Sequence, residues 1–187
     1  SIPIDDNITF SFQEVGEIRK NDAYGGYRIS LTATFLPMKV PLKLDITTGD
    51  KITPEAVEYK YPMMFSDDTL EIFAYNLETI LAEKLETVLS RGDQNTRPRD
   101  YYDIFILSKL KGHEIDRATL HKALSETAQK RNSGDLIPQY RSIVKQVIES
   151  TAMQQHWKTY QRDYEYAKEV EFSSACETII KIMDSLR

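Results

Sequence analysis

The stretch YRISLTATF at residues 27–35 and the stretch VPLKLDIT at residues 40–47 decide the fold of the first half of this chain. Apolar and polar side chains alternate in both, which is the period of a strand with one buried face. Pro37 and Pro41 bracket a short connection between the two stretches. Adjacent strands with so short a connection predict an antiparallel pair.

Other segments of the first half extend this prediction. Two further strands are expected at Val57–Tyr61 and Leu70–Ala74. A first helix is expected from Asn7 to Lys20, with Asn7 as its capping residue. The first half is therefore predicted to be mixed α and β.

The second half has the periodicity and the caps of helices. A helix is predicted at Leu77–Arg91 after the cap Asn76, a second from residue 99 or 100 to Lys111, and a third from the cap Asp116 to Arg131. Two or three more helices should follow from Pro138 to Arg187. The predicted fold class is α+β, with residues 1–76 as an α/β core and residues 77–187 as a helical part.

Composition narrows the class of protein. The chain has 187 residues, 41% of them apolar, and a net charge of −5, which argues against a broadly basic surface for nucleic acid but leaves a local basic cleft open. The sequence contains neither a run of about 18 apolar residues nor an N-terminal leader pattern, so a cytoplasmic protein without a membrane span is expected. The single cysteine, Cys176, fits a reducing compartment.

Two basic residues stand on the apolar side of the predicted 77–91 helix. Lys84 and Arg91 project into the stripe formed by Leu81, Leu85 and Val88. An unpaired cation is costly to bury, so a functional role is one interpretation. The other is snorkelling of long side chains to water, with Arg91 also favoured at a helix C-terminus. The position of Lys84 in mid-helix favours function, whereas Arg91 leaves both interpretations open.

Three aspartates also fall on positions where a charge is unexpected. Asp100 and Asp103 lie among the apolar positions of the next helix, although either could serve its N-terminus, Asp100 as the cap and Asp103 in the first turn. Asp45 shares the polar face of its strand, where a carboxylate can hold Mg²⁺ or can simply face solvent.

Taken in order, these residues resemble the motifs of the AbiEii/AbiGii toxin family. The resemblance rests on the strings LDITTGD at 44–50, LAEKL at 81–85 followed by Arg91, and RDYYDI at 99–104, within a stretch from about Arg28 to Leu107. It implies a DNA polymerase β-like nucleotidyltransferase with a partial mixed or antiparallel sheet and a helical C-terminal part. The implied reaction is metal-dependent transfer of a nucleotide from a nucleoside triphosphate, possibly to tRNA, by a toxin paired with an antitoxin.

The same resemblance implies roles for particular residues. Asp45 matches a carboxylate that binds Mg²⁺, and Lys84 matches a lysine that contacts nucleotide phosphates, with Arg91 as a second phosphate contact. Asp103, with Asp100, matches the position of a base.

The family's Gly-Gly or Gly-Ser turn followed by Asp-x-Asp is not found ahead of Arg28. Gly25-Gly26 lacks the following Asp-x-Asp, and Asp5-Asp6 has the wrong spacing. We therefore expect an N-terminally truncated chain that is inactive by itself. A non-catalytic nucleotide-, RNA- or protein-binding module is the alternative, and helix caps in an unrelated fold are a third possibility.

The segment HWKTYQR at 156–162, with Tyr164 and Tyr166, mixes aromatic and basic residues. Such a mixture can stack nucleic-acid bases, but an amphipathic helix with aromatic core residues explains the pattern more simply.

Overall fold

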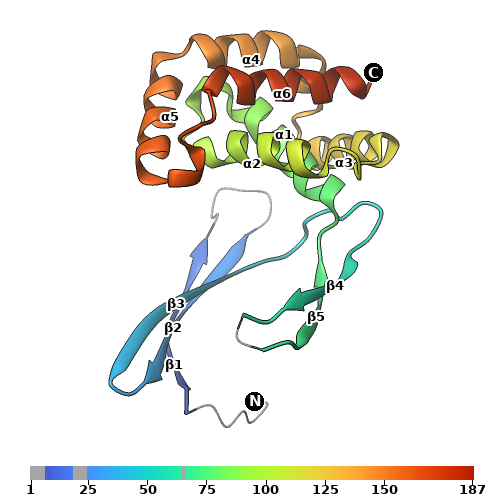
Figure 1. Cartoon of the computed structure of the whole chain (residues 1–187). Coiled ribbons are helices and arrows are strands. Elements are labelled where there is room, and N and C mark those ends of the chain that lie inside the picture. The colour runs from blue at the N-terminus through green and yellow to red at the C-terminus, as the bar shows by residue number, and fades with distance from the viewer. Residues whose placement is uncertain (1–6, 19–24, 65) are drawn as a thin grey trace. The chain divides into compact units, whose positions relative to one another are not determined.

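A computed structural model describes residues 7–18, 25–64 and 66–187 (Figure 1). The described strands are β1 (Thr9–Ile18), β2 (Gly26–Phe35), β3 (Met38–Thr47), β4 (Val57–Pro62) and β5 (Thr69–Ala74). The described α-helices are α1 (Leu77–Arg91), α2 (Pro98–Lys111), α3 (Arg117–Lys130), α4 (Tyr140–Glu149), α5 (Thr151–Asp163) and α6 (Phe172–Ser185). The predicted α+β class is confirmed, as are the four strands and the three helices predicted after residue 26.

The chain divides into two compact units, Ser1–Asp50 and Lys51–Arg187. The first contains a three-stranded antiparallel sheet in the order β1-β2-β3, and the second contains the β4-β5 hairpin and the helices. No helix in the described parts of the chain is long and apolar enough to cross a membrane.

The predicted first helix is wrong, because its described residues form β1. Phe10 and Phe12 are two residues apart, as in a strand, but Val15 follows after three, as in a helix. A β-bulge between Phe12 and Glu14 absorbs the extra residue, so Val15 returns to the same face as the two phenylalanines. Asn7 has a positive φ of 56° and caps no helix, and Asp5 and Asp6 lie outside the described residues.

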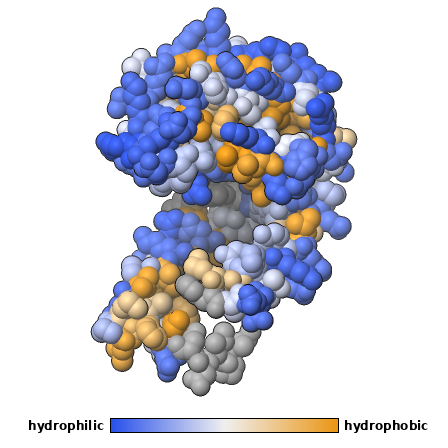
Figure 2. Space-filling view, viewed as in Figure 1, coloured by the Kyte–Doolittle hydropathy of each residue, from blue (hydrophilic) through white to orange (hydrophobic). Residues whose placement is uncertain are grey.

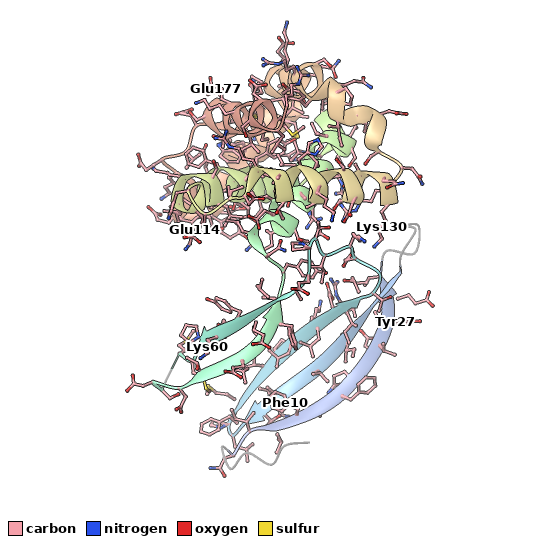
Figure 3. All side chains as sticks on the ribbon, turned by 90° about the vertical axis from the view of Figure 1, so that its right-hand side faces the viewer. Phe10, Tyr27, Lys60, Glu114, Lys130 and Glu177 are labelled. Carbon is pink, nitrogen blue, oxygen red and sulfur yellow. The ribbon has the colours of Figure 1, made fainter. Side chains whose placement is uncertain are left out.

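The strand register gives the three-stranded sheet one apolar face. Cross-strand rows such as Phe12–Leu31–Leu42 and Val15–Ile29–Leu44 run across all three strands on that face. Figure 2 shows hydrophobic surface over these strands, and Figure 3 labels Phe10 and Tyr27 on the face, where they are 62% and 55% exposed. The polar face carries Arg28 opposite Asp45.

The helical part has a continuous core. α6 packs against both α2 and α4, and α1 packs against α2 and α3 (Figure 1). Leu81, Leu85 and Val88 of α1 are fully buried, as their helical spacing predicts. The core fixes α1 and α2 against each other, and these two helices carry most of the charged residues singled out in the sequence.

Helix α1 begins at the predicted cap. The Asn76 side-chain oxygen accepts a hydrogen bond from the Thr79 backbone N–H at 2.7 Å. Its amide donates to the backbone oxygens of Thr53 at 2.7 Å and Glu55 at 3.2 Å. Asn76 therefore starts the helix and also holds the segment that leads into the β4-β5 hairpin.

We expect Asn76→Ala to lower the free energy of unfolding of the Lys51–Arg187 unit by about 1–2 kcal/mol, because the cap and both donated hydrogen bonds are lost. Asn76→Ser is the matched control, since serine caps a helix equally well but is too short to reach Thr53. Urea unfolding should show that serine recovers about 1 kcal/mol of the loss. Equal losses in both variants would show that capping contributes little.

Candidate active site

Lys84 lies between two aspartates that the sequence had singled out separately. Its ammonium group is 2.6 Å from Oδ2 of Asp103 and 3.4 Å from Oδ1 of Asp100. Lys84 is in the middle of α1, whereas both aspartates lie in the first half of α2. Packing of α1 on α2 therefore brings one basic and two acidic residues together into one site.

The site is largely withdrawn from water. The side chain of Lys84 is 22% exposed, that of Asp103 is 21% exposed and that of Asp100 is 7% exposed. Oδ2 of Asp100 is buried and has no hydrogen-bond partner among the described residues, although Nε of Arg97 lies 3.6 Å away. A buried carboxylate oxygen without a hydrogen bond is costly, and a catalytic role or a bound water or ion is among the explanations for such an atom.

Helix α2 begins one or two residues before the predicted start, and its predicted cap is wrong. Asp100 is not the cap, because the helix starts at Pro98, whose fixed φ and missing N–H suit the first helical position. Asp100 is instead in the first turn, where an acid is favoured, and its side chain turns towards Lys84. Capping therefore does not explain why Asp100 is buried.

Two arginines that the sequence analysis did not assign complete the site. Nε of Arg97 lies 3.6 Å from Asp100, and Nε of Arg99 lies 3.7 Å from Asp103. The signal was present in the motif itself, because Arg99 and Asp103 are four residues apart and therefore share a helix face. With Lys84, the arginines bring three positive charges against two negative ones, so the site as a whole is positive.

This arrangement can bind an anion and accept a proton. A lysine ammonium has three N–H donors, and the two aspartates use two of them. The remaining donor and the positive balance suit a phosphate group. The carboxylates keep further lone pairs that can accept hydrogen bonds or a proton.

Asp45 belongs to the other unit and is engaged there. Arg28 donates to both of its carboxylate oxygens, at 2.6 and 2.7 Å, across neighbouring strands. This hydrogen bonding raises the pKa of Arg28. In the described parts of the chain no group of three or more His, Cys, Asp or Glu residues could hold a metal ion. Asp45 is therefore paired with Arg28 in this structure, and its role as a metal ligand stays a prediction.

Arg91 lies in the last turn of α1 and is exposed. It is seven residues beyond Lys84, about two helical turns along the same side of the helix. Within the described residues no ion pair joins Arg91 to the aspartates around Lys84. The structure thus unites Lys84, Asp100 and Asp103 and leaves Arg91 at the end of their helix.

Comparison with known proteins identifies the class. A family of nucleotidyltransferases matches residues 2–178, which is most of the chain. The chain belongs to this family, the AbiEii nucleotidyl transferase toxins of type IV toxin–antitoxin systems. The resemblance inferred from three short motifs is confirmed, and the interpretation of the aspartates as caps in an unrelated fold is wrong.

Other comparisons add little. No curated protein matches the sequence significantly. A crystal structure of a nucleotidyltransferase candidate from H. pylori is similar with a TM-score of 0.42 and 13% sequence identity. The similarity covers 95% of this chain and 66% of that one, so this chain spans about two thirds of the length of that relative.

Proposed function

We propose that the protein transfers a nucleotide from a nucleoside triphosphate to an RNA acceptor, with tRNA as the first candidate, and that it acts as a toxin controlled by a cognate antitoxin. The observation that carries this proposal is the contact of Lys84 with Asp103 and Asp100 in a partly buried, net positive site. Membership in the AbiEii family supports the reaction class.

Each residue of the site has a proposed role. The Lys84 ammonium binds a phosphate oxygen of the triphosphate and offsets the charge that develops during transfer. Asp103 accepts the proton of the acceptor hydroxyl. The hydroxyl oxygen of the acceptor then bonds to the α-phosphorus, and pyrophosphate leaves. Asp100 is the more buried of the two acids and holds Lys84 in place. Arg91, further along α1, contributes a second contact to phosphate.

Asp45 is proposed as the one carboxylate that the described residues contribute to a magnesium site. A divalent ion held by carboxylates would neutralise phosphate charge during transfer. Arg28 donates one hydrogen bond to each oxygen of Asp45, so a metal ion would bind at the remaining lone pairs or replace Arg28. We further propose that the 187-residue chain by itself does not catalyse transfer, since no group of three or more His, Cys, Asp or Glu residues in its described parts could hold a metal ion.

The test is incorporation of α-³²P-labelled nucleoside triphosphates into RNA by the full-length protein, with and without EDTA. Asp45→Asn should reduce incorporation at least tenfold, because a metal ligand is lost. Asp50→Asn is the matched control on the same segment and should retain activity. Equal activity of the Asp45→Asn variant and the wild type would remove Asp45 from the site.

The second candidate is a non-catalytic binding module derived from this fold. The Arg28–Asp45 ion pair favours it, because a carboxylate held by two hydrogen bonds is stable without any metal. A binding module would show no incorporation with any nucleotide, and nucleotide or RNA affinity would be unchanged in Asp45→Asn.

A further inference from the structure

Four tyrosines from three segments of the chain gather beside the Lys84 site. Tyr102 comes from α2, Tyr160 from α5, and Tyr164 and Tyr166 from the segment that follows α5. Ring centroids are 4.9 Å apart for Tyr102 and Tyr166, 4.8 Å for Tyr160 and Tyr164, and 5.5 Å for Tyr164 and Tyr166. We name these four residues the tyrosine cluster.

The tyrosine cluster has a buried support and an exposed surface. Tyr160 is only 6% exposed, whereas Tyr164 and Tyr166 are 46% and 52% exposed. The hydroxyl groups of Tyr160 and Tyr166 are hydrogen-bonded at 3.1 Å, and the Tyr102 hydroxyl donates to the Tyr166 backbone oxygen at 3.4 Å. The exposed rings are therefore fixed by neighbours before any ligand arrives, which lowers the entropy lost on binding.

One face of α2 joins the tyrosine cluster to the site. Tyr102 and Asp103 are three and four residues beyond Arg99, so each of them is a neighbour of Arg99 on the surface of α2. Burial and the nearby charge of Asp103 both raise the pKa of Tyr102. The pKa of Tyr160 is also raised, mainly by burial and by its hydrogen bond to Tyr166, with a smaller contribution from Asp103, while Arg99 lowers it slightly. The tyrosine cluster therefore lies next to Asp103, the proposed base, and Arg99.

We propose that Tyr102, Tyr164 and Tyr166 stack an unpaired base of the single-stranded nucleic-acid acceptor and so bring its terminal hydroxyl to Asp103. This inference rests on the proposed function. Aromatic rings flanked by cations are the usual means of binding bases without sequence preference. Arg99 is 75% exposed and its ion pair with Asp103 is long, at 3.7 Å, so its guanidinium can also meet the phosphate beside the stacked base.

The chemistry of the cluster favours a base over an apolar protein segment. All four rings carry a hydroxyl group, and Arg99, three residues before Tyr102 on α2, adds a cation that is 75% exposed. The exposed face of the β1-β2-β3 sheet, by contrast, carries mainly aliphatic and phenylalanine side chains, with Tyr27 at one end and without cations in its described rows. A flat ligand with polar edges and a negative backbone fits the tyrosine cluster.

The test is fluorescence anisotropy of a labelled single-stranded 12-nucleotide RNA with the full-length protein in the absence of nucleoside triphosphate. The double variant Tyr164→Ala/Tyr166→Ala should raise Kd by about 5- to 150-fold, as expected for the loss of one stacked base. The variant Tyr164→Phe/Tyr166→Phe should bind as the wild type does, because the rings remain. Tyr59 is an equally exposed tyrosine on β4, so Tyr59→Ala is the control for nonspecific binding by exposed rings. This variant should leave Kd for RNA unchanged.

The outcomes separate this inference from the proposed function. Unchanged RNA affinity in the alanine variant of an enzyme that transfers nucleotides would overturn the stacking site and leave the function standing. Tyrosine-dependent RNA binding by a protein that transfers no nucleotide would support the stacking site and overturn the proposed function. A change in oligomeric state, with RNA affinity unaffected, would assign the cluster to a protein contact and overturn the inference. Single-stranded DNA of the same sequence, tested in parallel, should bind at these rings as well, and only a transfer assay distinguishes the two acceptors.

Discussion

Asp103→Asn is expected to lower kcat for nucleotidyl transfer by about 10²- to 10⁴-fold in the full-length protein, because a general base contributes on that scale. Asparagine has nearly the same shape, and its oxygen can still accept the hydrogen bond from Lys84. The fold and the position of Lys84 should therefore survive, while the group that takes up the proton is lost. The measurement is steady-state incorporation of labelled nucleotide at saturating substrate.

Lys84→Met and Asp135→Asn are the companion variants. Removing the ammonium group should lower kcat/KM for the nucleoside triphosphate by about 10²- to 10³-fold, since a preorganised charge next to phosphate is lost. Asp135 is exposed, and its change to asparagine should leave both constants unaltered. If Asp103→Asn raised KM alone and kept kcat, the carboxylate would position Lys84 and would not act as the base.

Trp157→Ala is expected to lower the free energy of unfolding of the Lys51–Arg187 unit by about 3–5 kcal/mol. Trp157 is 2% exposed, and its ring lies 5.3 Å from that of Phe172 and 5.7 Å from that of Tyr160. Its indole N–H donates to the Val170 backbone oxygen at 3.0 Å. Truncation would remove these contacts together and leave a cavity between α5 and the start of α6.

Tyr164→Ala is the matched control, seven residues along the same aromatic segment. Because Tyr164 is 46% exposed and contacts only the rings of Tyr160 and Tyr166 among the described aromatic side chains, its loss should lower the free energy of unfolding by about 1 kcal/mol, well below the loss for Trp157→Ala. Urea unfolding followed by far-UV circular dichroism compares the two variants. A loss below 1 kcal/mol for Trp157→Ala would show that the aromatic packing around α5 contributes little to stability.

The helical part could be predicted closely because local signals agree there. Asn76 and Asp116 both accept the hydrogen bonds expected of caps, and the helices after them end within one residue of the prediction. β1 was missed because its period changes at the bulge, and a bulge depends on the partner strand β2 and is invisible in β1 alone. The alternation of β2 and β3 has no such interruption.

The sequence predicted the residues of the candidate site but not their contacts with one another. Periodicity marked Lys84, Asp100 and Asp103 as charges on apolar stripes, but only packing of α1 on α2 shows that Lys84 forms ion pairs with both aspartates. The same holds for the segment around residue 160. Its spacing suggested either core or stacking surface, and the structure divides it, with Trp157 and Tyr160 buried and Tyr164 and Tyr166 exposed. Burial depends on contacts from distant segments, which no local pattern contains.

The division of the chain after Asp50 determines what tryptophan fluorescence can report. The sequence has a single tryptophan, Trp157, and it is buried in the Lys51–Arg187 unit. Emission of its indole therefore reports on that unit and is silent on the β1-β2-β3 sheet, whose intrinsic emission comes from tyrosine alone. Two units can melt separately, so agreement between indole emission and a probe of the β-strands is needed before one transition is assigned to the entire chain.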